Sequence, residues 1–527
     1  MTKSVRRSVK HEKPVERLII WFTILAITGI VAAHLVAALV HNLSPELHLD
    51  AWTINLVAIG LAAVFTFMFP RLPHILPEWL DGSGRAHPVR ATLFSLLAFL
   101  TIVQIARLST HKTDPNTSWW ILTTNEFWSA HECGTAYFYA VELNDRGEEN
   151  IYLANHYPIL NRNIEPHSNL EGMRVEDAFQ YPPQFLLLPK LLLSITHHFP
   201  TIRIIWFSLQ FFGIAAVFLL LANWVGGTAG RWMAMLTPLV MISPAALYAY
   251  QYTQFHLIAI ALAIAGMYAF EKQRNALGGA LLAAAILGKI FPGFLLILLL
   301  AEKRWKPLAW TAVYGIGITI IALVILGIAP FSAFINYHLP RMQSFAAFNF
   351  INTWPEFRFE LITANLSPYG QIVKLGEMGV HGMTQMIASG VNSFFTLILI
   401  VLIIIASRRL VSRVLRVQVW LAILGLASMI SPAAWGDYIT LPAMWLLTVL
   451  AIEAGDNRKL AVVFGICWIF FYFLLGLVPI GTYPAAVITY TLSTINFILL
   501  FGLMVWVMLR RTHLVPEMAD KSSLNAY

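Results

Sequence analysis

Long apolar runs recur along the whole chain, and short polar stretches separate them. Most of the runs are roughly 17 to 25 residues long, which is the length an α-helix needs to cross a bilayer core of about 30 Å. We therefore predict an all-α polytopic membrane protein. The single spans that we expect are 18–40, 53–70, 91–107, 203–224, 232–249, 254–270, 307–329, 387–407, 418–432, 438–452, 460–480 and 485–509.

One apolar stretch, 275–301, needs a different arrangement. It lies between two charged loops, 271–274 and 302–306, so an even number of crossings must fit. Lys289 and Pro292 mark its midpoint. Two short helices that meet there, with their irregular backbone shielded by protein or water, satisfy the backbone polar groups. With this hairpin the pattern predicts about fourteen transmembrane helices.

The charged residues orient these helices. Lys and Arg gather in short loops that fall on one side of the predicted bundle, and positive charge marks the cytoplasmic side. The polar segments on the other side are long. We expect a cytoplasmic N-terminus with two additional transmembrane helices (1–90), a transmembrane core (91–509) with non-cytoplasmic loops 108–202 and 330–386, and a cytoplasmic tail (510–527).

Composition supports the membrane assignment and excludes several functions. Hydrophobic residues make up 58% of the chain and charged residues 12%, whereas a soluble domain carries about 25% charged residues. The net charge of +8 comes from the topogenic loops, so nucleic-acid binding is not expected. Cys133 and Cys467 give neither a disulfide framework nor a metal site. No phosphate-binding glycine loop and no serine-hydrolase elbow is present.

The first long polar segment runs from Leu108 to Tyr181, carries a cluster of acids and ends in Tyr181-Pro182-Pro183. We expect this segment to cover an active site on the non-cytoplasmic face. The prolines also suit the first turn of a helix, so a structural role for Tyr181-Pro182-Pro183 stays open.

Six short motifs carry a family resemblance. In order along the chain they are Glu132-Cys133-Gly134-Thr135-Ala136-Tyr137-Phe138-Tyr139-Ala140, Phe179-Gln180-Tyr181-Pro182-Pro183-Gln184-Phe185, Thr253-Gln254-Phe255-His256, Lys289-Ile290-Phe291-Pro292, Asn365-Leu366-Ser367 with Gly370 and Lys374, and Ser431-Pro432-Ala433-Ala434-Trp435. Together they resemble membrane glycosyltransferases of the GT-C fold. More narrowly, the chain is similar to the polyprenyl-phosphate-mannose-dependent α-1,2-mannosyltransferases. Two features depart from that pattern. An Asp is usual near the start of the first outer loop, and the nearest acid here is Glu132 or, upstream, Asp114. Histidines are usual after Trp435, and Gly436-Asp437-Tyr438 follows it here.

The resemblance implies a direct displacement at the anomeric carbon of a lipid-linked sugar, with inversion. A carboxylate acts as general base, for which Glu132 and Asp114 are the candidates. Cations stabilise the leaving phosphate, and Lys289 is the strongest candidate because a cation within the membrane is costly. The candidate substrate-binding residues are Lys289, Tyr181, Gln254, His256, Arg341, Asn365, Lys374 and Trp435.

Each assignment has a structural alternative. Glu132 can be a solvated loop acid, Lys289 can bind a helix-end carbonyl, and Gln254 and His256 can make interhelical hydrogen bonds. The function also has alternatives: transfer of an arabinose-type pentose or another hexose to lipid A or a cell-wall polymer, or transport of a lipid-linked glycan. Transporters tend to show paired broken helices in two related halves, and the single hairpin here favours an enzyme.

The expected partners follow from the same hypothesis. They are a polyprenyl-phosphate sugar donor, a glycan or glycolipid acceptor and membrane lipids. No cofactor and no metal site is predicted, although acids in the first loop leave assistance by a divalent cation open. The expected location is the plasma (inner) membrane, in several passes, with the active site on the periplasmic or extracytoplasmic face.

Overall fold

The computed structural model describes residues 15–44, 46, 50–68, 88–114, 117, 132–344, 346–348, 353–410, 412–431, 433–434, 440–469 and 485–510. Within these residues the protein is helical, and the sole β feature is an isolated bridge between Glu171 and His198. Six helices are long and apolar enough to cross a membrane. The predicted all-α polytopic class is thereby confirmed, while the count of about fourteen crossings and the side on which the loops lie stay predictions.

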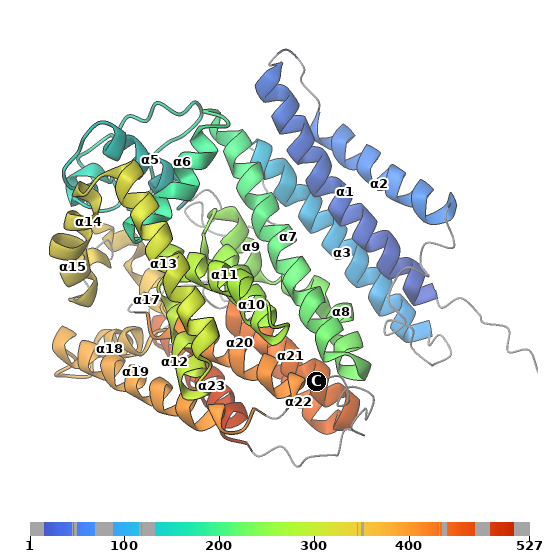
Figure 1. The fold of residues 1–527 in the computed structure, drawn as a ribbon. Coiled ribbons are helices and arrows are strands. Elements are labelled where there is room, and N and C mark those ends of the chain that lie inside the picture. Colours follow the sequence, from blue (N-terminus) through green and yellow to red (C-terminus); the bar gives the residue numbers. More distant parts are fainter. Residues whose placement is uncertain are drawn as a thin grey trace, which may run out of the picture.

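Helices make up most of the described chain (Figure 1). They are α1 (Val15–Leu43), α2 (Ala51–Met68), α3 (Pro88–Thr113), α5 (Thr135–Asp145), α6 (Leu187–Leu193), α7 (Phe199–Val225), α8 (Gly227–Met241), α9 (Pro244–Gln251), α10 (His256–Glu271), α11 (Asn275–Gly288), α12 (Phe294–Ala301), α13 (Trp305–Leu326), α14 (Ala329–Ala333), α15 (Leu339–Gln343), α17 (Arg358–Ala364), α18 (Pro368–Glu377), α19 (Gln385–Ser407), α20 (Arg413–Met429), α21 (Thr440–Asp456), α22 (Arg458–Ile469) and α23 (Ala485–Leu509). Single 3-10 turns at Pro183–Leu186 and Phe291–Gly293 and a π-turn at Phe334–His338 complete the elements used below.

The first three helices lie side by side and form one unit at one edge of the bundle (Figure 1). α1 packs against α2 and α3, and both α1 and α3 pack against α7. Buried polar side chains link the three helices: His34 hydrogen-bonds to Asn55 at 3.1 Å, and the Asn55 amide donates to Thr110 Oγ1 at 3.1 Å. Such bonds between apolar helices fix how the helices are rotated against each other. The three helices are therefore fixed in register relative to one another.

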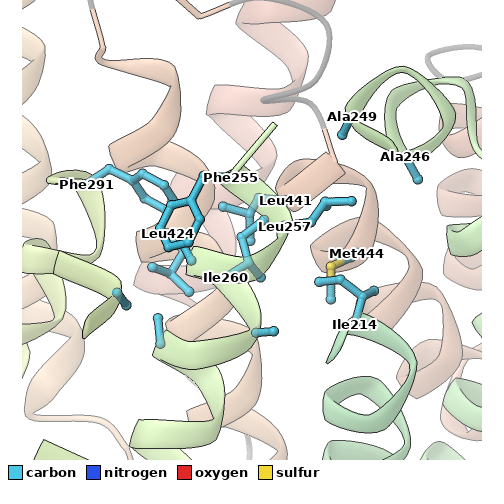
Figure 2. Packing of buried hydrophobic residues seen from close by; sticks show 14 of the residues in the cluster. Ile214, Ala246, Ala249, Phe255, Leu257, Ile260, Phe291, Leu424, Leu441 and Met444 are labelled. Carbon is cyan, nitrogen blue, oxygen red and sulfur yellow. The ribbon is translucent and has the colours of Figure 1, made fainter. Parts of the chain in front are cut away.

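The core lies where α7, α9, α10, α20 and α21 meet. Figure 2 shows Ile214 of α7 beside Met444 of α21, and Leu424 of α20 beside Phe255 and Phe291. Every residue of α20 from 417 to 429 is buried, as expected for a helix that is apolar all round and enclosed by other helices. α13, by contrast, exposes most of its apolar side chains, among them Val324 at 80%. α20 is thus central, whereas α13 has an apolar outer surface suited to lipid.

The predicted helix break in 275–301 is confirmed. α11 ends at Gly288, Lys289 is extended (φ −154°, ψ 126°), and a 3-10 turn leads into α12. The predicted single span 232–249 is wrong, because the chain breaks into α8 and α9. Ser243 caps α9 by accepting a hydrogen bond from the Ala246 amide, and Pro244 fills the first helical position, where no amide donor is needed.

The tyrosine and prolines at 181–183 begin a helical stretch, which agrees with the structural role that the sequence left open. Pro182 precedes a 3-10 turn, Pro183–Leu186, and α6 continues directly from it. Pro183 and Phe185 are buried, so this start is anchored in the protein rather than solvated. Tyr181 itself is 8% exposed, and its side chain belongs to the candidate site described next.

Candidate functional site

Glu132 lies in a buried cluster of charges just before α5. Its side chain is 7% exposed and contacts two cations that come from different helices. The ammonium of Lys112, in the last turn of α3, lies 3.2 Å and 3.3 Å from the two carboxylate oxygens. The Nε of Arg203, near the start of α7, donates to Glu132 Oε2 at 2.9 Å. Burial therefore contradicts the alternative in which Glu132 is a solvated loop acid.

The turn between α9 and α10 touches the same carboxylate. The hydroxyl of Thr253 donates to Glu132 Oε1 and accepts from the Lys112 ammonium at 3.0 Å. Thr253 has φ +54°, a left-handed conformation that is unusual for a β-branched residue and that persists where the surroundings impose it. Gly134 is one of the surroundings that hold Thr253 in this conformation. The Gly134 amide donates to the Tyr252 carbonyl at 3.0 Å, and a Cβ on Gly134 would lie 2.7 Å from the Thr253 side chain.

A hydrogen-bonded group of two tyrosines and one glutamine continues from this turn. Tyr137 of α5 and Tyr181 lie with their hydroxyls 2.8 Å apart. Tyr181 donates to the Gln254 side-chain oxygen at 2.9 Å. Burial raises the pKa of Tyr137 well above its ordinary value, so its phenol keeps its proton. Both rings also lie against Phe185, with centroids 4.8 Å and 4.7 Å away.

Lys289 brings a cation to this aromatic group. It lies in the break between α11 and α12, is 9% exposed, and its ammonium is 5.4 Å from the centroid of the Tyr181 ring. His256, the first residue of α10, packs on Phe291 of the same break, with ring centroids 4.8 Å apart. The structure thus brings together four sequence-predicted residues, Tyr181, Gln254, His256 and Lys289, and places them next to the turn that contacts Glu132.

Other predicted residues lie in separate contacts. The Lys374 ammonium donates to the Asn365 carbonyl and to Ser493 Oγ, both at 2.7 Å, and burial lowers the pKa of Lys374 to about 7. The Asn365 side chain accepts from the amides of Ser367 and Ala434 at 3.0 Å and 3.1 Å. These contacts tie α18, α23 and the 433–434 segment together. Both residues are engaged in holding the fold in this structure.

Three further predicted residues are placed differently. The guanidinium of Arg341 lies 4.9 Å from the Tyr337 ring centroid and donates to the Ala346 carbonyl at 3.2 Å. Asp114 follows the end of α3, is exposed, and its carbonyl accepts from the Thr117 amide at 3.2 Å. Trp435 lies outside the described residues.

Sequence reasoning missed Lys112 and Arg203 as site residues. Both are 5% exposed or less and lie at the ends of apolar helices. That placement was itself a signal, because a cation inside a membrane-embedded bundle is costly and marks a partner or a site. Thr253 was quoted only as part of a motif, and nothing in the sequence indicates its left-handed backbone.

Residues of the second long polar segment, 330–386, contact residues of the first, 108–202. The imidazole of His338 stacks on Tyr152 with centroids 4.4 Å apart, and Gln180 donates to the Ala347 carbonyl at 3.0 Å. Burial lowers the pKa of His338 to about 4, so the ring is neutral at ordinary pH. Trp354 donates to the Ile159 carbonyl at 3.0 Å. These contacts join residues 132–202 to residues 334–344, 346–348 and 354 in one cap.

The arrangement offers a carboxylate for proton transfer and a nearby cation for an anionic group. No set of three or more metal-ligating side chains is grouped among the residues that the structure describes. General acid–base work with electrostatic stabilisation is the chemistry that these residue types perform.

The comparisons with known proteins add the class. Residues 179–432 match the model of glycosyltransferase family 87. This match supports the predicted enzyme class, so the protein is a glycosyltransferase, and its apolar helices make it a multi-pass membrane protein. No curated protein and no solved structure matches the chain. The matched segment contains Arg203 and Lys289, whereas Lys112 and Glu132 lie before it.

Proposed function

We propose that the protein transfers mannose from a polyprenyl-phosphate donor to a glycan or glycolipid acceptor on the non-cytoplasmic face of the plasma membrane. One observation carries the proposal. Thr253 binds the Glu132 carboxylate, and the next residue, Gln254, binds Tyr181, whose ring lies beside the Lys289 ammonium. A group that can take a proton and a group that can meet a phosphate therefore belong to one continuous cluster.

The chemical step follows from these two groups. An acceptor hydroxyl attacks the anomeric carbon while Glu132 takes its proton, a task worth roughly 10²- to 10⁴-fold in rate. The bond between the anomeric carbon and the phosphate oxygen breaks, and the phosphate leaves with the electron pair. Lys289 stabilises the charge that develops on that oxygen. A single displacement inverts the configuration of the sugar.

The remaining predicted residues have supporting roles in this proposal. Tyr181 and Gln254 hold the sugar between Glu132 and Lys289, and His256 shapes the wall beside Lys289. Arg341 and Trp435 stay proposed substrate contacts. Asn365 and Lys374 were proposed in the same role, and we expect them to act mainly through the hydrogen bonds that tie α18 to α23. The aromatic rings of Tyr181 and Phe185 stack on each other, with centroids 4.7 Å apart, and give this part of the cluster a rigid apolar side.

Purified protein in lipid vesicles, supplied with synthetic polyprenyl-phosphate mannose and a glycolipid acceptor, tests the proposal. We expect mannose to appear on the acceptor with inverted configuration. The same vesicles receive the arabinose-type donor in a parallel reaction, and faster transfer from that donor would favour the alternative sugar. Movement of a lipid-linked glycan across the vesicle without any sugar transfer would contradict an enzyme. A reaction with a chelator shows whether a divalent cation assists.

A further inference from the structure

We propose that Lys112 is a positioning residue for the reaction, which holds the Glu132 carboxylate in the orientation needed to take a proton. The inference rests on the proposed role of Glu132 as general base. It adds that the N-terminal helices belong to the catalytic machinery, because Lys112 is supplied by α3, which precedes the matched segment 179–432.

The contacts of Lys112 distinguish positioning from substrate binding. Its side chain is 0% exposed. An ammonium has three N–H donors and no acceptor. Lys112 directs them to the Glu132 carboxylate, to the Gln251 carbonyl and to the Thr253 hydroxyl. All three donors are used inside the protein, so none is left for a sugar or a phosphate. Lys112 therefore acts through Glu132 rather than on the substrate.

Arg203 does not replace this contact. Its Nε binds one carboxylate oxygen, Oε2, at 2.9 Å. Lys112 lies within 3.3 Å of both oxygens and also binds the α9–α10 turn, so it connects the carboxylate to the part of the site that continues to Gln254. Arg203 thus holds one carboxylate oxygen, whereas Lys112 connects both oxygens to the α9–α10 turn and so relates the orientation of Glu132 to the rest of the site.

The N-terminal helices fix the place of Lys112. Thr110, two residues earlier on α3, accepts the hydrogen bond from Asn55 of α2, and Asn55 in turn binds His34 of α1. α3 then packs on α7, which carries Arg203. The register of the first three helices thus determines where the Lys112 ammonium lies.

A four-enzyme comparison tests the inference: the wild type, Lys112→Met, Glu132→Gln and the double variant, each in the mannose-transfer assay. Lys112→Met keeps the length of the side chain and leaves Glu132 its contact with Arg203. We expect kcat to fall about 10²-fold, as for a reacting group displaced by about 1 Å, with KM for the donor unchanged. The double variant should be no slower than Glu132→Gln alone, because the lysine acts only through that carboxylate. Lys112→Arg should restore part of the lost kcat.

Arg416→Met is the matched control. Arg416 forms ion pairs with Glu271 and Glu302 at 3.4 Å and 2.9 Å, and Glu271 ends α10, the helix that Thr253 precedes. At 1.5 Å per residue the two ends of α10 are about 22 Å apart. This variant should lose thermal stability and keep its kcat per folded molecule. If Lys112→Met yields no folded protein, Lys112→Gln enters the same comparison, with an expected loss of at least about tenfold.

The outcomes separate the inference from the proposed function. If the Lys112 variants kept the wild-type kcat while Glu132→Gln was inactive, the inference would be overturned. The proposed role of Glu132 as general base would still stand. Equal losses from Lys112→Met in the wild-type and Glu132→Gln backgrounds would also overturn the inference, because the lysine would then act independently. Full activity of Glu132→Gln would instead refute the proposed base itself.

Discussion

The hydroxyl of Thr253 donates a hydrogen bond to the carboxylate of Glu132, although 121 positions separate the two residues in the chain. Thr253 does so from a left-handed backbone conformation, φ +54°. A β-branched residue adopts that conformation only where its surroundings impose it. The pair therefore joins the α9–α10 turn to the start of α5 in one defined geometry.

Replacing Thr253 with Val tests this contact, because Val keeps the shape of the side chain and removes the hydroxyl. A hydrogen bond to a charged group is worth about 1.5–3 kcal/mol, which corresponds to a roughly 10- to 100-fold fall in kcat. Transfer rates at saturating donor measure the effect. Thr253→Ser is the control and should stay close to wild type, since it keeps the donor. Unchanged kcat in Thr253→Val would show that the contact does not orient Glu132.

Gly134→Ala should destabilise the protein. Its new Cβ would lie 2.7 Å from both the Cβ and the Cγ2 of Thr253, so the α9–α10 turn would have to move away from α5. Forcing extra atoms into a packed site costs about 1–3 kcal/mol. Thermal unfolding in detergent measures the loss. Gly317→Ala, inside α13, meets nothing within 4 Å and should be neutral or slightly stabilising. Equal unfolding temperatures for the two variants would contradict the close packing.

The structure places Lys289 and Lys374, both proposed from the sequence as substrate contacts, in different surroundings. We expect Lys289→Met to reduce kcat/KM for the donor at least tenfold, because we propose that its charge stabilises the leaving phosphate. Lys374→Met removes the bonds to the Asn365 carbonyl and to Ser493, so its main effect should be a lower unfolding temperature. Parallel kinetics and thermal unfolding distinguish the two effects. A loss of kcat/KM in Lys374→Met as large as in Lys289→Met would place Lys374 at the donor instead.

The stack of His338 on Tyr152 predicts a pH dependence of stability. The pKa of His338 is lowered by burial from 6.5 to about 4. Between these values the unfolded chain binds a proton that the folded protein does not, so this residue lowers stability as the pH falls from 6.5 to 4 and has no effect above that range. Unfolding temperatures across this range measure the slope. His338→Phe keeps an aromatic ring and should flatten the slope, and an unchanged slope would contradict the assignment.

Much of this site could be predicted from the sequence because its residues lie in short motifs at helix ends. The break at Lys289 follows from counting crossings between two charged loops, and it holds in the structure. Tyr181, Gln254 and His256 lie at similar ends and converge there. These signals come from the residues directly beside each helix end, so they can be read from a single sequence.

The pairing of Lys112 and Arg203 with Glu132 could not be predicted in the same way. These residues lie 20 and 71 positions from Glu132, and their contacts depend on how α3, α5 and α7 pack. A charge at a helix end indicates that a partner exists without identifying it. The division of 232–249 at Ser243-Pro244 was different, because a capping serine before a proline is a local signal and was overlooked.

The initial rate of mannose transfer by Glu132→Gln, beside wild type and Asp114→Asn, tests the central claim most directly. Glutamine keeps the size of the side chain and cannot take the proton. We predict a loss of roughly 10²- to 10⁴-fold for Glu132→Gln and a rate close to wild type for Asp114→Asn, whose side chain is exposed. Full turnover by Glu132→Gln would contradict the assignment of the base.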